Sequence, residues 1–278
     1  MEDNLTARRE MSYRLFAYFS CEGPLSRRPA VCVVLARMPT IKVKRQSFTF
    51  PVAGDSVPAI FQCPSSDEAL PAVLLLHGFS SRKERMADSI GRALAARRVA
   101  SLAIDLPLHG ARNAGFEGIS FQNPVAVIQK WRLAVREAHA GLAYLEAHDA
   151  IDGGRIGIAG YSLGAYLATA VAADNTLAQA IALAAGGDLP PQTPFASLVR
   201  SVVDPRRAVR GFAGRPLLMI NGRFDRTIQP EQAKSLFDAS SEPKELRWYD
   251  GGHWPPQSAI DSVAEWLAAS LDSLPRSG

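Results

Sequence analysis

A short pentapeptide, GYSLG at residues 160–164, restricts the fold of this chain more than any other segment. The apolar residues 155–159 precede it and the helix-favouring residues 165–170 follow it, which predicts a buried strand, a sharp turn and then a helix. In that setting G-x-S-x-G is the pattern of a nucleophile elbow, a strained turn that holds the serine hydroxyl clear of the sheet. The flanking glycines are needed because a Cβ at either position would collide with the neighbouring strand and helix. We therefore expect Ser162 to be a nucleophile.

A serine nucleophile needs a general base, and the chain order that accompanies such an elbow is Ser, then Asp or Glu, then His. The chain has five histidines, and His253 is the only one that follows Ser162. It comes just after residues 245–249, which have the composition of a strand. A loop at the carboxyl end of a strand can reach the elbow, so we predict that His253 is the base.

The base in turn needs an acid that orients its ring. Asp225 follows the apolar residues 216–221 and a glycine turn, between the serine and the histidine in the chain. A carboxylate at the end of a buried strand fits this role, so Asp225 is the predicted acid. Asp188 and Asp204 lie in a looser preceding segment and are weaker alternatives.

Two backbone N–H groups are expected to bind the oxyanion that forms when a serine attacks a carbonyl. One belongs to Leu163, the first residue of the helix after the serine, where N–H groups have no partner within the helix. The other belongs to Phe79, in the loop that follows the apolar strand 72–76. His77, at the end of that strand, is interpreted as a structural residue that holds the loop by a hydrogen bond.

Three further side chains are predicted to line a substrate pocket. Tyr161 and Trp254 are adjacent in the chain to the serine and the histidine, although a role in the core is equally open for both. His109 lies in the loop after the strand at 99–104, where bracing of the loop is the favoured alternative. Asp105 and Arg112 of the same loop are expected to pair with each other rather than to contact substrate.

The motifs VLLLHGF, AIDLPLHGAR, RIGIAGYSLGA, PLLMINGRFD and YDGGHWPP follow one another across about residues 41 to 273. With them the chain resembles the α/β-hydrolase superfamily, and it is similar to serine-bearing dienelactone-hydrolase-like esterases and peptidase-type hydrolases. Dienelactone hydrolase proper uses a cysteine nucleophile, whereas the elbow here carries Ser162, and this difference favours general ester hydrolysis.

The resemblance implies an enzyme that cleaves carboxylic esters through a Ser-Asp-His triad and an acyl-enzyme intermediate, with no metal or organic cofactor. The same residues also serve thioesterases, peptidases and acyltransferases, which stay open as alternatives. An alternative from another class is a non-catalytic ligand receptor or scaffold of the same fold.

The fold class that the pattern predicts is α/β, with a mostly parallel central sheet and helices on both faces. An antiparallel hairpin is expected at residues 41–50 and 57–63, before the parallel strands. The parallel strands are predicted at 72–76, 99–104, 155–159, 178–184, 216–221 and 245–249, and the helices at 84–97, 124–148, 163–173, 230–240 and 256–271. The segment 186–214 is too short for a large cap domain.

Regular strand alternation starts just after Met38, and residues 1–37 lack it. We expect residues 38–278 to form the α/β-hydrolase domain and residues 1–37 to be an N-terminal extension, either disordered or upstream of the true start. The competing interpretation is that parts of this extension pack as extra elements.

Composition excludes several classes of protein. The formal net charge of +4 comes from interspersed residues without a basic tract, so nucleic-acid binding is not expected. The longest apolar runs are too short to span a membrane. Cys21, Cys32 and Cys63 are odd in number and lack the spacing of a metal site, which favours a reduced, cytoplasmic protein. The expected partner is a small-molecule ester, and the oligomeric state is left open.

Overall fold

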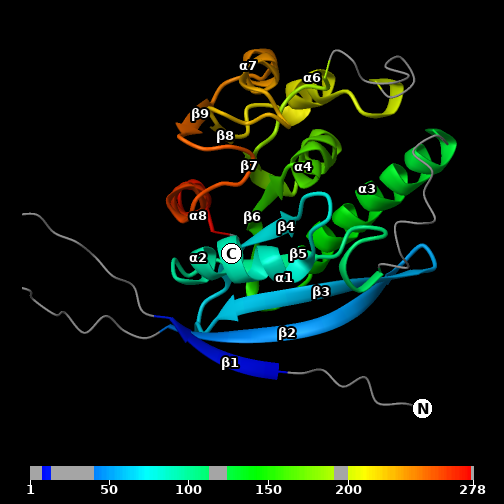
Figure 1. Cartoon of the computed structure of the whole chain (residues 1–278). Coiled ribbons are helices and arrows are strands. Elements are labelled where there is room, and N and C mark those ends of the chain that lie inside the picture. The colour runs from blue at the N-terminus through cyan, green and yellow to red at the C-terminus, as the bar shows by residue number, and fades with distance from the viewer. Residues whose placement is uncertain (1–7, 14–40, 113–123, 191–199, 277–278) are drawn as a thin grey trace, which may run out of the picture.

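A mixed sheet forms the centre of the computed structural model, which describes residues 8–13, 41–112, 124–190 and 200–276 (Figure 1). Within these ranges the sheet has nine strands in the order β1-β2-β3-β5-β4-β6-β7-β8-β9. The strands are β1 (Arg8–Tyr13), β2 (Ile41–Val52), β3 (Asp55–Pro64), β4 (Leu70–Leu76), β5 (Ala100–Ile104), β6 (Ile151–Tyr161), β7 (Ala178–Ala184), β8 (Leu217–Gly222) and β9 (Lys244–Tyr249).

The six strands from β5 to β9 along one side of the sheet are all parallel to one another. The central strands β4 and β5 are predominantly apolar because both faces are covered, and every residue of these two strands is buried. The edge strand β9 is more polar and only partly buried. β3 pairs with β5 in the antiparallel direction, and β2 pairs with β3 as the predicted hairpin. The predicted fold class is therefore confirmed.

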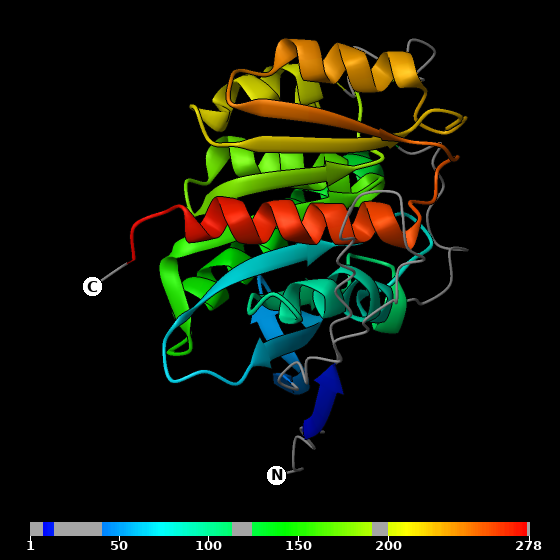
Figure 2. The same cartoon turned by 90° about the vertical axis from the view of Figure 1, so that its left-hand side faces the viewer.

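Helices cover the two faces of the sheet as separate layers (Figures 1 and 2). On one face α3 (Pro124–Glu146), α4 (Leu163–Asp174), the 3-10 turn η4 (Val209–Phe212) and α7 (Pro230–Ala239) enclose a first apolar cluster. On the other face α8 (Gln257–Asp272) lies across the sheet in Figure 2, beside the chain of short helices α1 (Lys83–Met86), η1 (Ala87–Gly91) and α2 (Arg92–Ala95), around a second cluster. The helix predicted at 84–97 thus contains a π-helical turn at η1.

As predicted, the described residues of the segment between β7 and β8 form no large cap domain. In its described part residues 200–202 are helical and are followed by α6 (Pro205–Ala208) and η4. Both α6 and η4 pack close to α4 and α7. Residues 191–199 lie outside the described residues. Among the described residues, the carboxyl end of β7 is therefore followed by a loop and short helical turns, not by a separate lid domain.

The proposed division at residue 38 remains a prediction. Most of the N-terminal extension, with Cys21 and Cys32, lies outside the described residues. Its described part is β1, which pairs with β2 in the antiparallel direction from Arg8 opposite Gln46 to Tyr13 opposite Ile41. None of the helices in the described ranges combines the length and the apolar character that crossing a bilayer requires.

Candidate active site

Ser162 lies at the turn between β6 and α4, with φ 53° and ψ −113°. This backbone conformation is sparsely populated for a residue with a side chain, and such strain is characteristic of functional turns. The Ser162 N–H donates to the Ala184 carbonyl at 2.9 Å, which ties the turn to the end of β7. A Cβ at Gly160 would collide with the Gly164 backbone, and one at Gly164 with the Leu76 carbonyl, so the turn can be this tight only with glycine at both positions.

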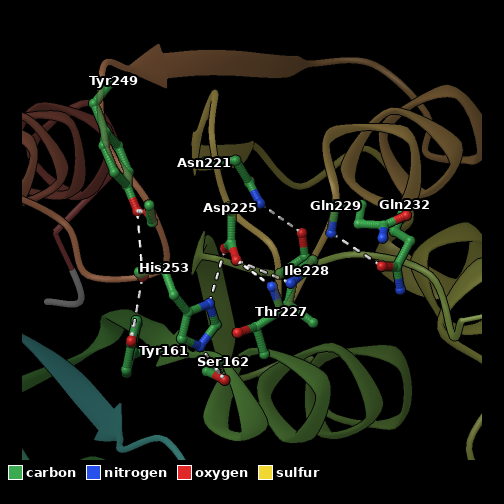
Figure 3. Close-up of polar contacts among 12 residues, drawn as sticks. Tyr161, Ser162, Asn221, Asp225, Thr227, Ile228, Gln229, Gln232, Tyr249 and His253 are labelled. Atoms are coloured by element: carbon green, nitrogen blue, oxygen red, sulfur yellow. Dashed lines mark hydrogen bonds and ion pairs between the residues drawn. The ribbon is translucent and has the colours of Figure 1, made fainter.

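His253 connects Ser162 to Asp225 by two hydrogen bonds (Figure 3). Its Nε2 lies 2.9 Å from the Ser162 Oγ, and its Nδ1 lies 2.8 Å from the Asp225 Oδ2. These three side chains come from the turn and loops after β6, β8 and β9, at the carboxyl ends of parallel strands in one half of the sheet. The arrangement has the connectivity of a nucleophile, a base and an orienting acid.

The Asp225 carboxylate is buried and its orientation is determined by the backbone around it. Its Oδ1 accepts hydrogen bonds from the N–H groups of Thr227 at 2.8 Å and Ile228 at 3.0 Å. The other oxygen is therefore the one presented to His253. The competing acids have other roles, because Asp188 pairs with Arg200 and the Asp204 side chain caps α6.

The chain segments that carry the acid and the base approach each other closely. Beyond the paired strands β8 and β9, the Phe224 N–H donates to the Gly251 carbonyl at 3.0 Å. A Cβ at Gly222 would collide with the Gly252 carbonyl, so this approach requires glycine at position 222. The close contact brings the loop after β8 within hydrogen-bonding distance of His253.

Two tyrosine hydroxyls hold the backbone of His253. The Tyr161 hydroxyl donates to the His253 carbonyl at 3.2 Å, and the Tyr249 hydroxyl lies 3.3 Å from the same oxygen and 3.0 Å from the Gly252 carbonyl (Figure 3). Burial raises the pKa of Tyr249 to about 12 and raises the pKa of Tyr161 further, so both remain protonated donors at neutral pH. Sequence reasoning missed Tyr249, although its place as the last residue before the histidine loop was visible.

Tyr161 and Trp254 differ in their exposure. Tyr161 is buried, and its ring packs 5.3 Å from the His253 ring and 5.4 Å from the Trp254 ring, centroid to centroid. Trp254 is 59% exposed and its ring forms part of the surface next to the histidine. Of the two predicted lining residues, Trp254 is the one that solvent and a ligand can reach.

The loop after β4 packs directly against the serine turn. A Cβ on Gly78 would lie 2.8 Å from the Tyr161 ring and 3.2 Å from the Ser162 Cβ, so the glycine allows the approach. Phe79 follows, and Leu163 is the first residue of α4. Ser162 thus has Leu163 next to it in the chain and Gly78, the residue before Phe79, next to it in space.

His77 braces this loop, as predicted. Its Nδ1 donates to the Gly78 carbonyl at 2.8 Å, and its Nε2 accepts from the Leu106 N–H at 3.1 Å. Burial lowers the pKa of His77 to about 4, so the ring is neutral and can accept at Nε2. His109 is buried too, with its Nδ1 2.8 Å from the Pro107 carbonyl and its ring 5.4 Å from that of Phe79.

The expected pairing of Asp105 with Arg112 is wrong for the side chains. The buried Asp105 carboxylate accepts from the Lys83 backbone at 2.8 Å and from the Lys83 Nζ at 2.7 Å. Arg112 instead binds Glu137 at 2.6 and 2.8 Å, and reaches only the carbonyl of Asp105, at 3.3 Å. Because Lys83 follows β4 and Asp105 follows β5, the ion pair ties the loop after β5 to the segment after β4, whose Gly78 packs against the serine turn.

Comparison with known proteins identifies the family. Residues 73–267 match the profile of the alpha/beta hydrolase family, which is most of the chain. The chain belongs to the alpha/beta hydrolase family and is a hydrolase. Among curated proteins, none matches the chain.

Solved structures share the fold at low sequence identity. A PEG-bound cold-adapted esterase from an Arctic intertidal metagenomic library is 21% identical, with a TM-score of 0.64, over 82% of this chain and 94% of that one. TT1662 from Thermus thermophilus is 21% identical, with a TM-score of 0.65, over 82% and 99%. Acetyl xylan esterase 1 from Thermoanaerobacterium sp. JW/SL YS485 is 16% identical, with a TM-score of 0.66, over 83% and 84%.

Proposed function

We propose that this protein hydrolyses carboxylic esters, with Ser162 as nucleophile, His253 as general base and Asp225 as orienting acid. The single observation that carries the proposal is the continuous chain of hydrogen bonds from the Asp225 Oδ2 through the His253 ring to the Ser162 Oγ, at 2.8 and 2.9 Å. The strained φ of Ser162 supports it, since the turn presents the hydroxyl to the base.

In the first half of the reaction, His253 Nε2 takes the proton of Ser162 as its Oγ attacks the ester carbonyl. The backbone N–H groups of Phe79 and Leu163 stabilise the oxyanion, a contribution of about 3 kcal/mol per donor. His253 then returns the proton to the departing alcohol oxygen, the carbonyl–oxygen bond breaks, and an acyl-enzyme forms on Ser162.

In the second half, His253 deprotonates a water molecule that attacks the acyl-enzyme. The second oxyanion collapses, the acid product leaves, and the proton returns from His253 to Ser162. Asp225 stabilises the imidazolium that forms twice in each cycle and keeps the ring in the tautomer whose Nε2 faces the serine. No step calls for a metal or an organic cofactor.

The similar solved structures support ester chemistry, since two of the three are structures of esterases. The proposed partner is accordingly a small-molecule ester. The cytoplasmic location and the lack of nucleic-acid partners stay predictions from composition.

Two measurements test the proposal. A fluorophosphonate probe should label the wild-type protein and the Ser273→Ala control, in which an exposed serine at the end of α8 is removed, and should not label Ser162→Ala. A panel of p-nitrophenyl esters, matched thioesters and aminoacyl amides should then show the highest kcat/KM for esters. Labelling of Ser162→Ala, or turnover of thioesters or amides alone, would contradict the proposal.

A further inference from the structure

An arginine next to the proposed triad lacks a carboxylate partner among the described residues. Arg85 belongs to α1, and its guanidinium carbon lies 4.8 Å above the ring centroid of Trp254. Trp254 follows His253 in the chain, and the two ring centroids are 6.3 Å apart. A guanidinium stacked in this way keeps its charge and its N–H donors while the stack limits its orientation.

Arg85 lines a polar cavity of about 720 Å³, together with another arginine, two carboxylates, three serines, His109 and Gly110. Both carboxylates have cationic partners. Glu84 lies 2.8 Å from the Lys83 Nζ and 3.8 Å from Arg82, and Asp88 pairs with Arg45. The negative charges of the cavity wall are therefore already paired with cations. The positive charge of Arg85 is not balanced by a carboxylate of the wall.

No triad residue lines the cavity, and the loop after β4 connects it to the reacting serine. Gly78 packs against the Ser162 Cβ, and Ser80, two residues further along the same loop, lines the cavity. On another side Arg85 rests on Trp254, beside the histidine. A volume of several hundred cubic ångströms is in the range of small-molecule sites. An ester bound at Ser162 can thus extend one of its two parts into this space.

We propose that the cavity binds the part of the substrate remote from the ester bond and that Arg85 recognises a carboxylate there. The inference rests on the ester hydrolysis proposed above and specifies its substrate class as esters that carry a carboxylate, such as monoesters of dicarboxylic acids. The guanidinium presents paired donors that match the two oxygens of a carboxylate, and the hydroxyls of Ser80 and Ser81 are further polar groups on the wall.

The test compares matched ester pairs that differ only in the charge. Mono-p-nitrophenyl glutarate and p-nitrophenyl pentanoate place a carboxylate or a methyl group on the acyl side. The 3-carboxyphenyl and 3-methylphenyl acetates do the same on the alcohol side. After subtraction of spontaneous hydrolysis, kcat/KM of the wild type should favour the charged ester by about tenfold in at least one pair, as a charge-assisted hydrogen bond permits.

The Arg85→Gln variant should lose this preference, measured as the ratio of kcat/KM for the charged ester to kcat/KM for the uncharged ester, so that a rate loss common to both esters does not count. Arg85→Lys should retain part of the preference, because the charge remains and the paired donors do not. Arg276→Gln removes an equal charge at an exposed residue that pairs with Glu68, and it should keep the full preference. Raised salt should weaken the preference in the wild type and not in Arg85→Gln.

The outcomes separate this inference from the function on which it rests. Hydrolysis of both members of each pair at equal rates, or a preference that survives in Arg85→Gln, overturns the role of Arg85 and leaves the ester hydrolysis intact. Failure of the protein to hydrolyse any of the four esters, with no labelling of Ser162, overturns the proposed function itself.

Discussion

Tyr161 and Tyr249 are predicted to hold the histidine loop jointly, so that loss of both hydroxyls does more damage than the two separate losses added together. Both hydroxyls approach the same acceptor, the carbonyl of His253, at 3.2 and 3.3 Å. Tyr161→Phe leaves that carbonyl the Tyr249 hydroxyl, which also lies 3.0 Å from the Gly252 carbonyl. Tyr249→Phe leaves it the Tyr161 hydroxyl, and the double variant leaves it neither hydroxyl.

The magnitude follows from the number of donors that remain. Each single substitution removes one hydrogen bond, which lowers the free energy of unfolding by about 1 kcal/mol. The double substitution also leaves a partly buried acceptor unsatisfied, which adds about 1–2 kcal/mol beyond the sum. Since 1.4 kcal/mol corresponds to a factor of ten in rate, misalignment of His253 should lower kcat up to about fivefold in the single variants and more than about fiftyfold in the double variant.

Two quantities are measured on the wild type, both single variants and the double variant: the free energy of unfolding in urea and the kcat for a p-nitrophenyl ester. Each gives a coupling energy between the two hydroxyls, one for stability and one for catalysis. Tyr144→Phe is the control, because that ring packs against Phe48 and Phe50 of the hairpin strand β2 and not against the triad loops. Additivity of the two single variants within about 0.5 kcal/mol in both measurements would refute the joint role.

Three further outcomes are expected. Asp225→Asn should lower kcat by about 10³–10⁴-fold while the free energy of unfolding changes little, because the His253 ring loses its orienting acceptor; equal damage from Asp204→Asn would contradict the assignment. Burial lowers the pKa of His77 to about 4, below its unfolded value of about 6.5, so the folded state favours the neutral ring. The stability that this difference contributes is fully present above pH 6.5 and is lost as the pH falls toward 4. Between pH 7 and 4 the wild type should therefore lose about 3 kcal/mol of unfolding free energy more than His77→Asn, as urea titrations at the two pH values will show; parallel losses would rule this out. A protein that starts at Met38 should stay soluble, melt within a few degrees of the full chain and keep its esterase rate, and a large drop in melting temperature would show that residues 1–37 cover core surface.

Most of the fold could be predicted because the residues within each strand or helix indicate that element by their local pattern. The strand predicted at 178–184 coincides with β7, and the apolar run at 72–76 lies within β4. Chain order alone selected His253 from five histidines, and its ring lies 2.9 Å from the Ser162 hydroxyl. These successes share one physical reason, which is that hydrophobic period and turn chemistry act over a few residues.

The ion pairs of the site could not be predicted, because they depend on which loops become neighbours. Lys83 and Asp105 are 22 residues apart and meet only because β4 and β5 pair in parallel. Arg112 pairs with Glu137 on α3, and no local sequence pattern indicates this ion pair. For the same reason the sequence allowed Tyr161 to be assigned to a pocket wall, whereas its hydroxyl reaches a carbonyl 92 residues further along the chain.

The spread of the proposed triad along the chain also bears on how activity arises during synthesis. Ser162 and His253 are 91 residues apart in the chain, and the acid and the base follow the last two strands, β8 and β9, at one edge of the sheet. Since a chain is made from its N-terminus, a nascent protein that ends after β7 carries the serine without its acid or its base. With the proposed triad, hydrolysis would begin only when the final two strands have joined the edge of the sheet. Recovery of turnover during refolding would then report the docking of this edge.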